Sequence, residues 1–168
     1  RKLKGNLLIA PVVGELQGGI GTDFLIRKGI IPDMAVVTEP TNLEIRTLTA
    51  GVAQFLIHVS GKSTHIGSID YVPNVNAIEK AAKVVDALTA LKLPSTRGIR
   101  FTYTPDGRLP GLPRMLIGGI MGGMGREYNL TRPSMVPDFC TIAIDVRFVV
   151  GMTVESIMRD ISCLLYTS

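Results

Sequence analysis

The hydrophobic pattern changes its period once along this chain, and that change limits the fold more than any other feature. Up to about residue 42, the apolar residues form continuous runs, "NLLIAPVV" and "MAVVTE", which are typical of strands buried on both faces of a parallel sheet. Farther on, "GVAQFLIHVSG" and "FCTIAIDVRF" alternate apolar and other residues, which is typical of half-exposed antiparallel strands. The sequence therefore predicts two structural units with different sheets.

A short helix is predicted between the two continuous runs. The segment "TDFLIRKG" begins at the candidate N-cap Thr22 and ends at Gly29, which is suited to close a helix. The opening stretch is therefore predicted to be a β-α-β unit of an α/β sheet.

Two amphipathic helices are predicted among the alternating strands. In "NAIEKAAKVVDALTALK", Asn76 and Glu79 resemble a capping box, and the second helix, "TVESIMRDI", starts at Thr153. The apolar residues of the first helix share one face: Ile78, Ala81, Ala82, Val85 and Leu88. With one or two strands around "RMLIGGIMGG", the order is β-α-β-β-α. This predicts a split β-α-β sheet that is backed by two helices and lacks its last strand.

Composition excludes several classes of protein. The 168 residues are 46% hydrophobic with a mean hydropathy of +0.32, enough for a buried core, and no run approaches the roughly 18 apolar residues of a membrane span. The net charge of +4 comes from scattered Lys and Arg without interleaved aromatics, which argues against nucleic-acid binding. Cys140 and Cys163 lack a CxxC spacing, which argues against a disulfide framework or a structural zinc site. We expect a cytoplasmic protein.

Two carboxylates follow the two continuous runs. Glu15 and Glu39 lie at the carboxyl ends of the predicted buried strands, where open α/β sheets gather their active sites. There they could share a metal ion or divide acid and base roles. In the alternative interpretation, Glu15 is an acidic residue at a turn and Glu39 ends a strand before Pro40. The glycines of "GGIGT" or "GGIMGG" could instead cradle phosphate, although no Walker lysine follows.

A histidine follows the first alternating strand. His65 lies in the Gly- and Ser-rich loop "GKSTHIGSID", where a neutral imidazole could donate a hydrogen bond to a substrate oxygen. In the alternative interpretation it is a solvated loop histidine. His58, in the middle of the strand, is interpreted as structural.

Four motifs in order resemble the zinc-dependent amidohydrolase and peptidase family that includes acetylornithine deacetylase, succinyl-diaminopimelate desuccinylase, aminoacylase and glutamate carboxypeptidase. They are a glutamate turn before "GGIGT", the pattern D(x)5EPT from Asp33 to Thr41, "GKSTHIG" followed by "NVNAI", and "VPDFCTIAIDVR" before "GMTVES". The similarity extends from Gly5 to about Ile161.

The resemblance implies a fragment of a two-domain enzyme. Residues 1–45 would be part of an α/β zinc-peptidase catalytic domain, and residues 46–162 would be a ferredoxin-like α+β lid, or dimerisation, domain. Residues 163–168 would be an atypical tail, because the family resemblance implies a final strand of the lid domain at this place and their sequence does not resemble one. We also expect the first segment, from Leu7 to Glu39, to stay loose when expressed without the rest of its sheet.

The resemblance also implies a role for each candidate residue. Glu15 would be the general base that takes the proton of a metal-activated water, and Glu39 would be a ligand of zinc, or of cobalt or manganese. His65 would stabilise the tetrahedral oxyanion in the active site of the partner subunit of a homodimer. Arg147 would bind the substrate carboxylate, and Ser134 stands where a substrate-contacting Asn is common.

The implied function is hydrolysis of an amide bond in an N-acyl amino acid or small peptide. Leu16 stands where most relatives carry a second metal-ligating Glu, and the family's upstream and downstream metal ligands have no counterpart in the chain. The fragment itself is therefore expected to be inactive. The alternatives are a non-catalytic dimerising or binding homologue on the same scaffold, and a phosphate-binding protein.

Overall fold

The chain forms two compact units. The computed structural model describes residues 3–92, 100–107, 111–127 and 133–167. One unit comprises Arg1–Arg46 and the other Thr47–Ser168. We call the second the lid unit and describe each unit by itself.

The first unit contains one regular element among its described residues, the helix α1 (Ile20–Arg27). The helix begins earlier than predicted, because Gly19, with φ 74°, takes the N-cap position instead of Thr22. Gly29 adopts φ 80° just beyond the helix, as the C-terminal glycine signal predicted. A left-handed glycine therefore flanks the helix at each end.

The two predicted strands of the first unit are absent. The segments 7–13 and 34–39 belong to no β-ladder, and their apolar side chains are exposed, with Leu8 at 62% and Val36 at 92%. A strand is stable only when other strands complete its hydrogen bonds and cover its faces, and a pair of strands alone is marginal. The prediction of strands in these two segments is therefore wrong for this structure.

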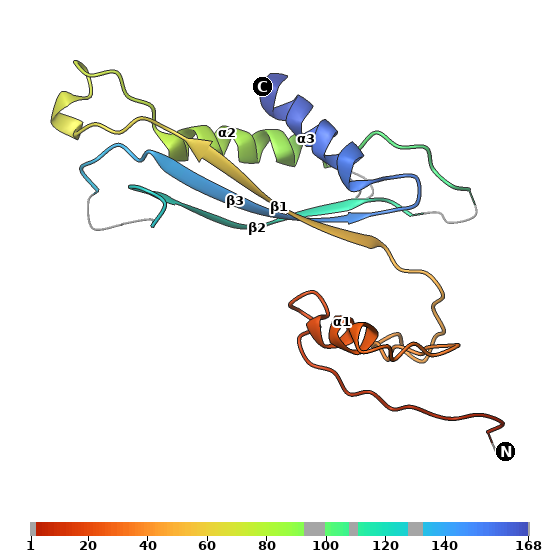
Figure 1. Ribbon diagram of the computed structural model, residues 1–168. Coiled ribbons are helices and arrows are strands. Elements are labelled where there is room, and N and C mark those ends of the chain that lie inside the picture. Colours follow the sequence, from red (N-terminus) through yellow and green to blue (C-terminus); the bar gives the residue numbers. More distant parts are fainter. Residues whose placement is uncertain (1–2, 93–99, 108–110, 128–132, 168) are drawn as a thin grey trace. The chain divides into compact units, whose positions relative to one another are not determined.

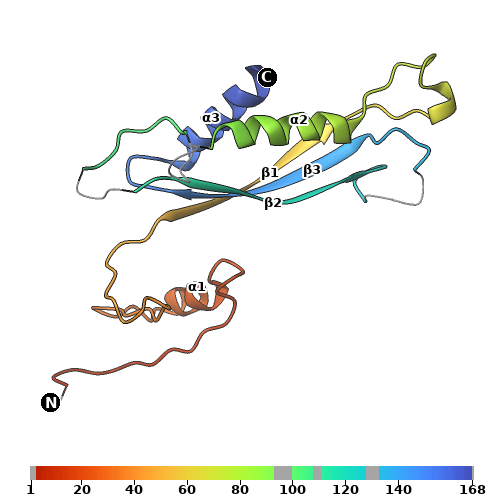
Figure 2. The same cartoon turned by 180° about the vertical axis from the view of Figure 1, so that it is seen from behind.

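The lid unit is a three-stranded antiparallel sheet with two helices on one face (Figures 1 and 2). The sheet order is β1-β3-β2, so β1 and β2 run parallel to each other with β3 between them. This is the predicted split β-α-β arrangement. The elements are β1 (Gly51–Ser60), the 3-10 helix η1 (Ile66–Ser68), α2 (Ala77–Ala90), β2 (Arg114–Gly123), β3 (Phe139–Phe148) and α3 (Val154–Thr167).

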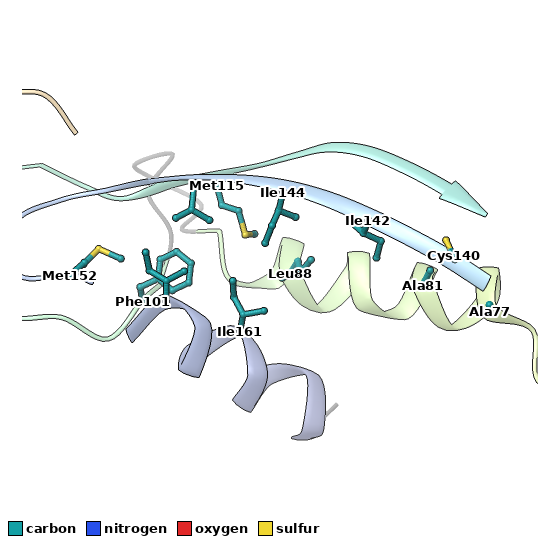
Figure 3. Packing of buried hydrophobic residues seen from close by; sticks show 12 residues of the cluster. Ala77, Ala81, Leu88, Phe101, Met115, Cys140, Ile142, Ile144, Met152 and Ile161 are labelled. Carbon is teal, nitrogen blue, oxygen red and sulfur yellow. The ribbon is translucent and has the colours of Figure 1, made fainter. Parts of the chain in front are cut away.

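The core lies between the sheet and its two helices (Figure 3). The predicted alternation is confirmed, because Phe55 pairs with Ile144 and Ile57 with Ile142 on the helix-covered face. The buried face of α2 differs in part from the predicted apolar face. Ala77, Ala81 and Leu88 are fully buried, together with Ile142, Val146 and Ile157 of the core, whereas Ile78 and Ala82 are exposed. Small alanines allow the helix backbone to approach the central strand closely.

The predicted atypical tail continues α3, which extends to Thr167. Leu164 and Leu165 are partly buried and pack against the core, so the amphipathic pattern of the helix persists into this segment. Residues 163–167 therefore continue helix α3 and do not form a strand. None of the described helices is long and apolar enough to cross a membrane.

The other side of the sheet, which we call the open face, is covered by neither α2 nor α3 (Figures 1 and 2). The alternate residues of β1, including Val52, Leu56 and His58, lie there and are exposed. His58 contacts Thr141 Oγ1 at 2.9 Å and stacks on Phe139 of β3. These contacts agree with its interpretation as a structural residue.

Candidate functional site

His65 lies on the loop that connects β1 to α2, beyond the carboxyl end of β1 (Figure 1). Lys62 and Val75 close the base of this loop by exchanging two backbone hydrogen bonds of 2.8 and 3.0 Å. Gly61 is required there, because a Cβ atom would lie 2.9 Å from both the Ala77 nitrogen and the Pro137 oxygen. The loop is therefore fixed at its base.

The tip of the loop is also fixed. The Val136 N–H donates to the Thr64 carbonyl, and the Ile66 N–H donates to the Ser134 carbonyl, each at 2.8 Å. Residues 61–66 thus extend the pairing of β1 with the chain that leads into β3. The structure brings two of the predicted site residues together, because Ser134 is bonded to the residue that follows His65. Both of them are exposed.

The imidazole of His65 is held in a defined orientation. Its Nδ1 accepts a hydrogen bond from the Gly67 N–H at 3.1 Å. A neutral imidazole whose Nδ1 accepts must carry its proton on Nε2. His65 therefore has an oriented N–H donor at Nε2, as a group that stabilises an oxyanion requires.

Arg147 lies near the carboxyl end of β3, on the open face. Its Nε donates to Asp145 Oδ1 at 2.7 Å and its Nη2 donates to Asp145 Oδ2 at 3.3 Å. Gln54 of β1 donates to the same carboxylate, to Oδ2, at 3.2 Å. The hydrogen bond from Gln54 and, after it, the contacts with Arg147 hold the pKa of Asp145 below its ordinary value, although burial opposes this.

The structure separates Arg147 from His65. Both Ser134 and His65 lie beyond the Phe139 end of β3, whereas Arg147 lies near the Phe148 end. At about 3.3 Å per residue, the strand from Phe139 to Arg147 alone spans about 26 Å. One lid unit therefore does not bring His65 and Arg147 to the same small ligand.

Glu15 and Glu39 are both in the first unit and both exposed. Glu15 lies in a turn, where its carbonyl accepts the Gly18 N–H at 3.1 Å. The carbonyl of Glu39 accepts the Thr41 N–H at 2.7 Å across Pro40. The turn at Glu15 agrees with its alternative interpretation, whereas no strand ends at Glu39.

A zinc site needs three or four ligands close together. Among the described residues, no group of three or more His, Cys, Asp or Glu side chains is arranged to hold a metal ion. The described residues therefore do not form a zinc site by themselves, and Glu39 is a single candidate ligand.

Two other features concern binding: the glycines of β2 and a hollow beside it. The glycines of "GGIMGG" belong to β2, where their backbone pairs with β3, so they do not form a phosphate loop. A hollow of about 450 Å³ lies where β2 begins and β3 ends, lined by Tyr103, Asp106, Leu112, Val149 and others. None of the candidate residues predicted from the sequence lines this hollow.

Comparison with known proteins identifies the lid unit. A family model described as the peptidase dimerisation domain, M20_dimer, matches residues 47–166. The chain belongs to the M20 family. This confirms the family that the sequence motifs suggested, and the mixed helix and strand architecture agrees with an M20 dimerisation fragment.

Two curated M20 relatives show how much of a longer protein this chain resembles. An N-formyl-4-amino-5-aminomethyl-2-methylpyrimidine deformylase of Halalkalibacterium halodurans is 26% identical over 95% of this chain and 36% of its own length. An acetylornithine deacetylase of Aliivibrio fischeri is 31% identical over 82% of this chain and 34% of its own length. The chain thus spans about a third of these relatives.

A solved structure also resembles part of this chain. The aminobenzoyl-glutamate utilization protein from Klebsiella pneumoniae is 18% identical, with a TM-score of 0.44, over 71% of this chain and 26% of its own.

Sequence reasoning missed the partners that orient Arg147. Gln54 and Asp145 are directly opposite each other in the register of β1 and β3. The spacing of Asp145 and Arg147, two residues apart on a strand, was a usable signal because such residues share a face. The contribution of Gln54 was not visible, because it depends on which strands pair.

Proposed function

We propose that this chain is part of a metal-dependent amidohydrolase that acts as a homodimer and cleaves amide bonds of N-acyl amino acids or small peptides. The observation that carries the proposal is the fixed orientation of His65, an exposed residue whose Nδ1 accepts the Gly67 N–H on a loop that backbone hydrogen bonds hold in place. Membership of a peptidase dimerisation family and the names of the curated relatives support the reaction class.

His65 acts as the donor to the oxyanion. When water attacks an amide carbonyl, negative charge develops on the carbonyl oxygen, and an oriented N–H stabilises the transition state more than the substrate. Because Gly67 holds Nδ1 as an acceptor, the donor nitrogen need not reorganise during the reaction. Ser134, adjacent to this loop, contributes a hydroxyl to the same substrate.

Arg147 binds the carboxylate of the substrate in the other active site of the dimer. The length of β3 keeps it too far from His65 of its own chain to hold the same small molecule. Each active site then receives His65 from one subunit and Arg147 from the other. This division supports an obligatory dimer, because a single subunit would lack one of the two groups.

Glu15 takes the proton of the attacking water, and Glu39 contributes one metal ligand. We propose zinc, with cobalt or manganese as the alternatives, because the related family is metal-dependent. The described residues of this chain do not complete such a site by themselves. The cytoplasm remains the proposed location.

A second candidate is a non-catalytic dimerising homologue. Leu16, next to Glu15, is 91% exposed and offers no ligand at the position where the family resemblance implies a second metal-binding carboxylate. On this alternative the lid unit still dimerises, but the longer protein neither binds a metal nor turns over a substrate.

The test uses the longer protein that contains this sequence, with hydrolysis of N-acetyl amino acids and metal content as readouts. His65→Ala is expected to lower kcat by about 10² to 10³, the usual cost of removing an oxyanion donor. His58→Ala removes the other histidine and is expected to leave kcat near the wild-type value. Wild-type protein without metal and without turnover would instead establish the non-catalytic homologue.

Mixed dimers test the division of each site between two subunits. Dimers that combine a His65→Ala chain with an Arg147→Ala chain contain one site with both residues intact, provided that each residue serves a different subunit's site. We expect such mixtures to regain activity that neither variant has alone. Mixtures as inactive as their parents would show that each site takes His65 and Arg147 from the same subunit.

A further inference from the structure

The open face carries a second arginine beside Arg147. In the register of the sheet, Arg147 of β3 is directly opposite Arg114, the first residue of β2. On its other side it is opposite Val52 of β1. Side chains directly opposite each other on one face of an antiparallel pair have Cβ atoms about 4.5 to 5.5 Å apart. The two guanidinium groups therefore project from neighbouring positions on the same exposed surface.

Asp145 leaves one edge of the Arg147 guanidinium free. Its carboxylate occupies Nε and one proton of Nη2, so Nη1 and the second proton of Nη2 remain available as donors. Gln54 holds the carboxylate from the other side. The fork of Arg147 is therefore oriented before any ligand binds, which lowers the entropy lost on binding.

Arg114 has no such carboxylate. Among the residues that the structure describes, none forms an ion pair or hydrogen bond with its side chain, and Asp145 is already engaged by Arg147 and Gln54. Like charges directly opposite each other across a ladder destabilise the sheet. Repulsion between Arg114 and Arg147 therefore destabilises the folded lid unit, and no described contact of Arg114 compensates for it.

The charges of this group sum to a single positive excess. Two guanidinium groups and one aspartate leave one unit of positive charge on an exposed patch, which one carboxylate would neutralise. Guanidinium is the cation best suited to the task, because its planar fork matches the two oxygens of a carboxylate.

We propose that Arg114 and Arg147 form a carboxylate clamp that holds one carboxylate of the substrate between two guanidinium groups. The proposal rests on the proposed hydrolase function and extends it, because Arg114 becomes a second binding residue. Asp145 and Gln54 are positioning residues, which act only by orienting Arg147. The clamp selects N-acyl amino acids with a free carboxylate over the same compounds blocked as amides.

The kinetic test uses the longer protein and a matched substrate pair, an N-acetyl amino acid and its carboxamide. Arg114→Gln is expected to raise KM for the acid about tenfold, with kcat unchanged, and to leave KM for the amide as it was. Arg114→Lys keeps the charge without the fork and is expected to recover part of the loss. Arg159→Gln, on α3 at the other face of the sheet, makes the same charge change and is expected to alter neither substrate.

Thermal unfolding separates a binding role from a structural role. Because it removes a like-charge contact, Arg114→Gln is expected to unfold at the same or a higher temperature than the wild type. A lower unfolding temperature together with equal losses for acid and amide would overturn the clamp, since Arg114 would then support the fold. Unchanged KM for the acid in Arg114→Gln would overturn it as well.

A binding measurement keeps the clamp testable if the protein hydrolyses nothing. Titration calorimetry of the same protein with the N-acetyl amino acid and its carboxamide measures carboxylate recognition without turnover. Binding of the acid that weakens about tenfold in Arg114→Gln supports the clamp even where the hydrolase proposal fails. Equal affinity for acid and amide, or no binding of the acid by the wild type, would contradict it.

Discussion

Asp145 both orients the side chain of Arg147 and affects how the stability of the lid unit depends on acidic pH. Its carboxylate accepts hydrogen bonds from Gln54 and Arg147, and these contacts lower its pKa below the ordinary value of 3.8. A carboxyl group with a lowered folded pKa stabilises the folded state above its unfolded pKa. That stabilisation is lost as the pH falls through the folded pKa.

The Asp145→Asn variant is therefore expected to lose part of the acid sensitivity of unfolding. At pH 7 the wild type should be the more stable of the two, and the difference should shrink as the pH falls below about 3.8, because both then carry a neutral group. Urea unfolding at pH 7, 4 and 3 measures it. Asp86→Asn, at an exposed position of α2, is the control and should keep the wild-type profile. A difference that stays constant from pH 7 to pH 3 would disprove the assignment.

At the scale of elements, the two helices of the lid unit begin where short-range signals place them. Asn76 Oδ1 accepts the Ile78 and Glu79 N–H groups at 3.0 and 3.3 Å, and its amide donates to Glu79 Oε1 at 3.0 Å. At α3, Thr153 Oγ1 accepts the Ser156 N–H at 3.1 Å while Ser156 Oγ accepts the Thr153 N–H at 3.0 Å. Both caps satisfy amides that the first helical turn leaves without partners.

Asn76→Ala is expected to lower the free energy of unfolding by about 1 kcal/mol, because two amides of α2 lose their acceptor. Urea unfolding of the wild type and the variant measures the loss. Thr89→Ala lies at an exposed position near the other end of α2 and is expected to cost less than half as much. Similar losses in the two variants would show that helix propensity, and not the cap, sets the stability of α2.

Strands follow a different rule from helices, as the two units show. The alternating segments formed β1 and β3, whereas the more hydrophobic segments 7–13 and 34–39 formed no ladder. A helix satisfies its own hydrogen bonds, but a strand needs partners that local sequence does not supply. Hydrophobicity therefore predicted burial in these segments without predicting the sheet that would provide it.

At the scale of the whole molecule, the chain divides into units of unequal order. The core residues belong to the lid unit, whereas the first unit contains exposed apolar side chains such as Leu7 at 70% and Ile9 at 78%. Apolar surface of this extent marks a segment that would be covered by further protein.

Limited proteolysis is expected to cut the segment from Leu7 to Glu39 first and to leave a resistant fragment that begins near Thr47. A fragment of residues 47–167 expressed alone is expected to give a cooperative unfolding transition, because the described core lies within it. Mass spectrometry of the digest and thermal melts of the fragment measure both outcomes. Equal resistance of the two units would contradict the division.

The sequence by itself determined the lid unit and most of its elements. The period-2 alternation, the caps at Asn76 and Thr153 and the motif around His65 are short-range features, so they predicted strands, helix starts and the M20 family. The predicted stripe of α2 is right in part, because Ala81, Val85 and Leu88 pack in the core, whereas Ala77 is buried in place of Ile78. The position of the buried stripe depends on the sheet beneath the helix, which the helix sequence does not specify.

Only the tertiary structure decided which residues become neighbours. The order β1-β3-β2 places Arg114 beside Arg147, and the length of β3 separates Arg147 from His65. Strand pairing is a contact between residues far apart in sequence, and many registers are compatible with the same alternation. The sequence therefore named the candidate side chains, while the pairing of the strands determined which of them are neighbours.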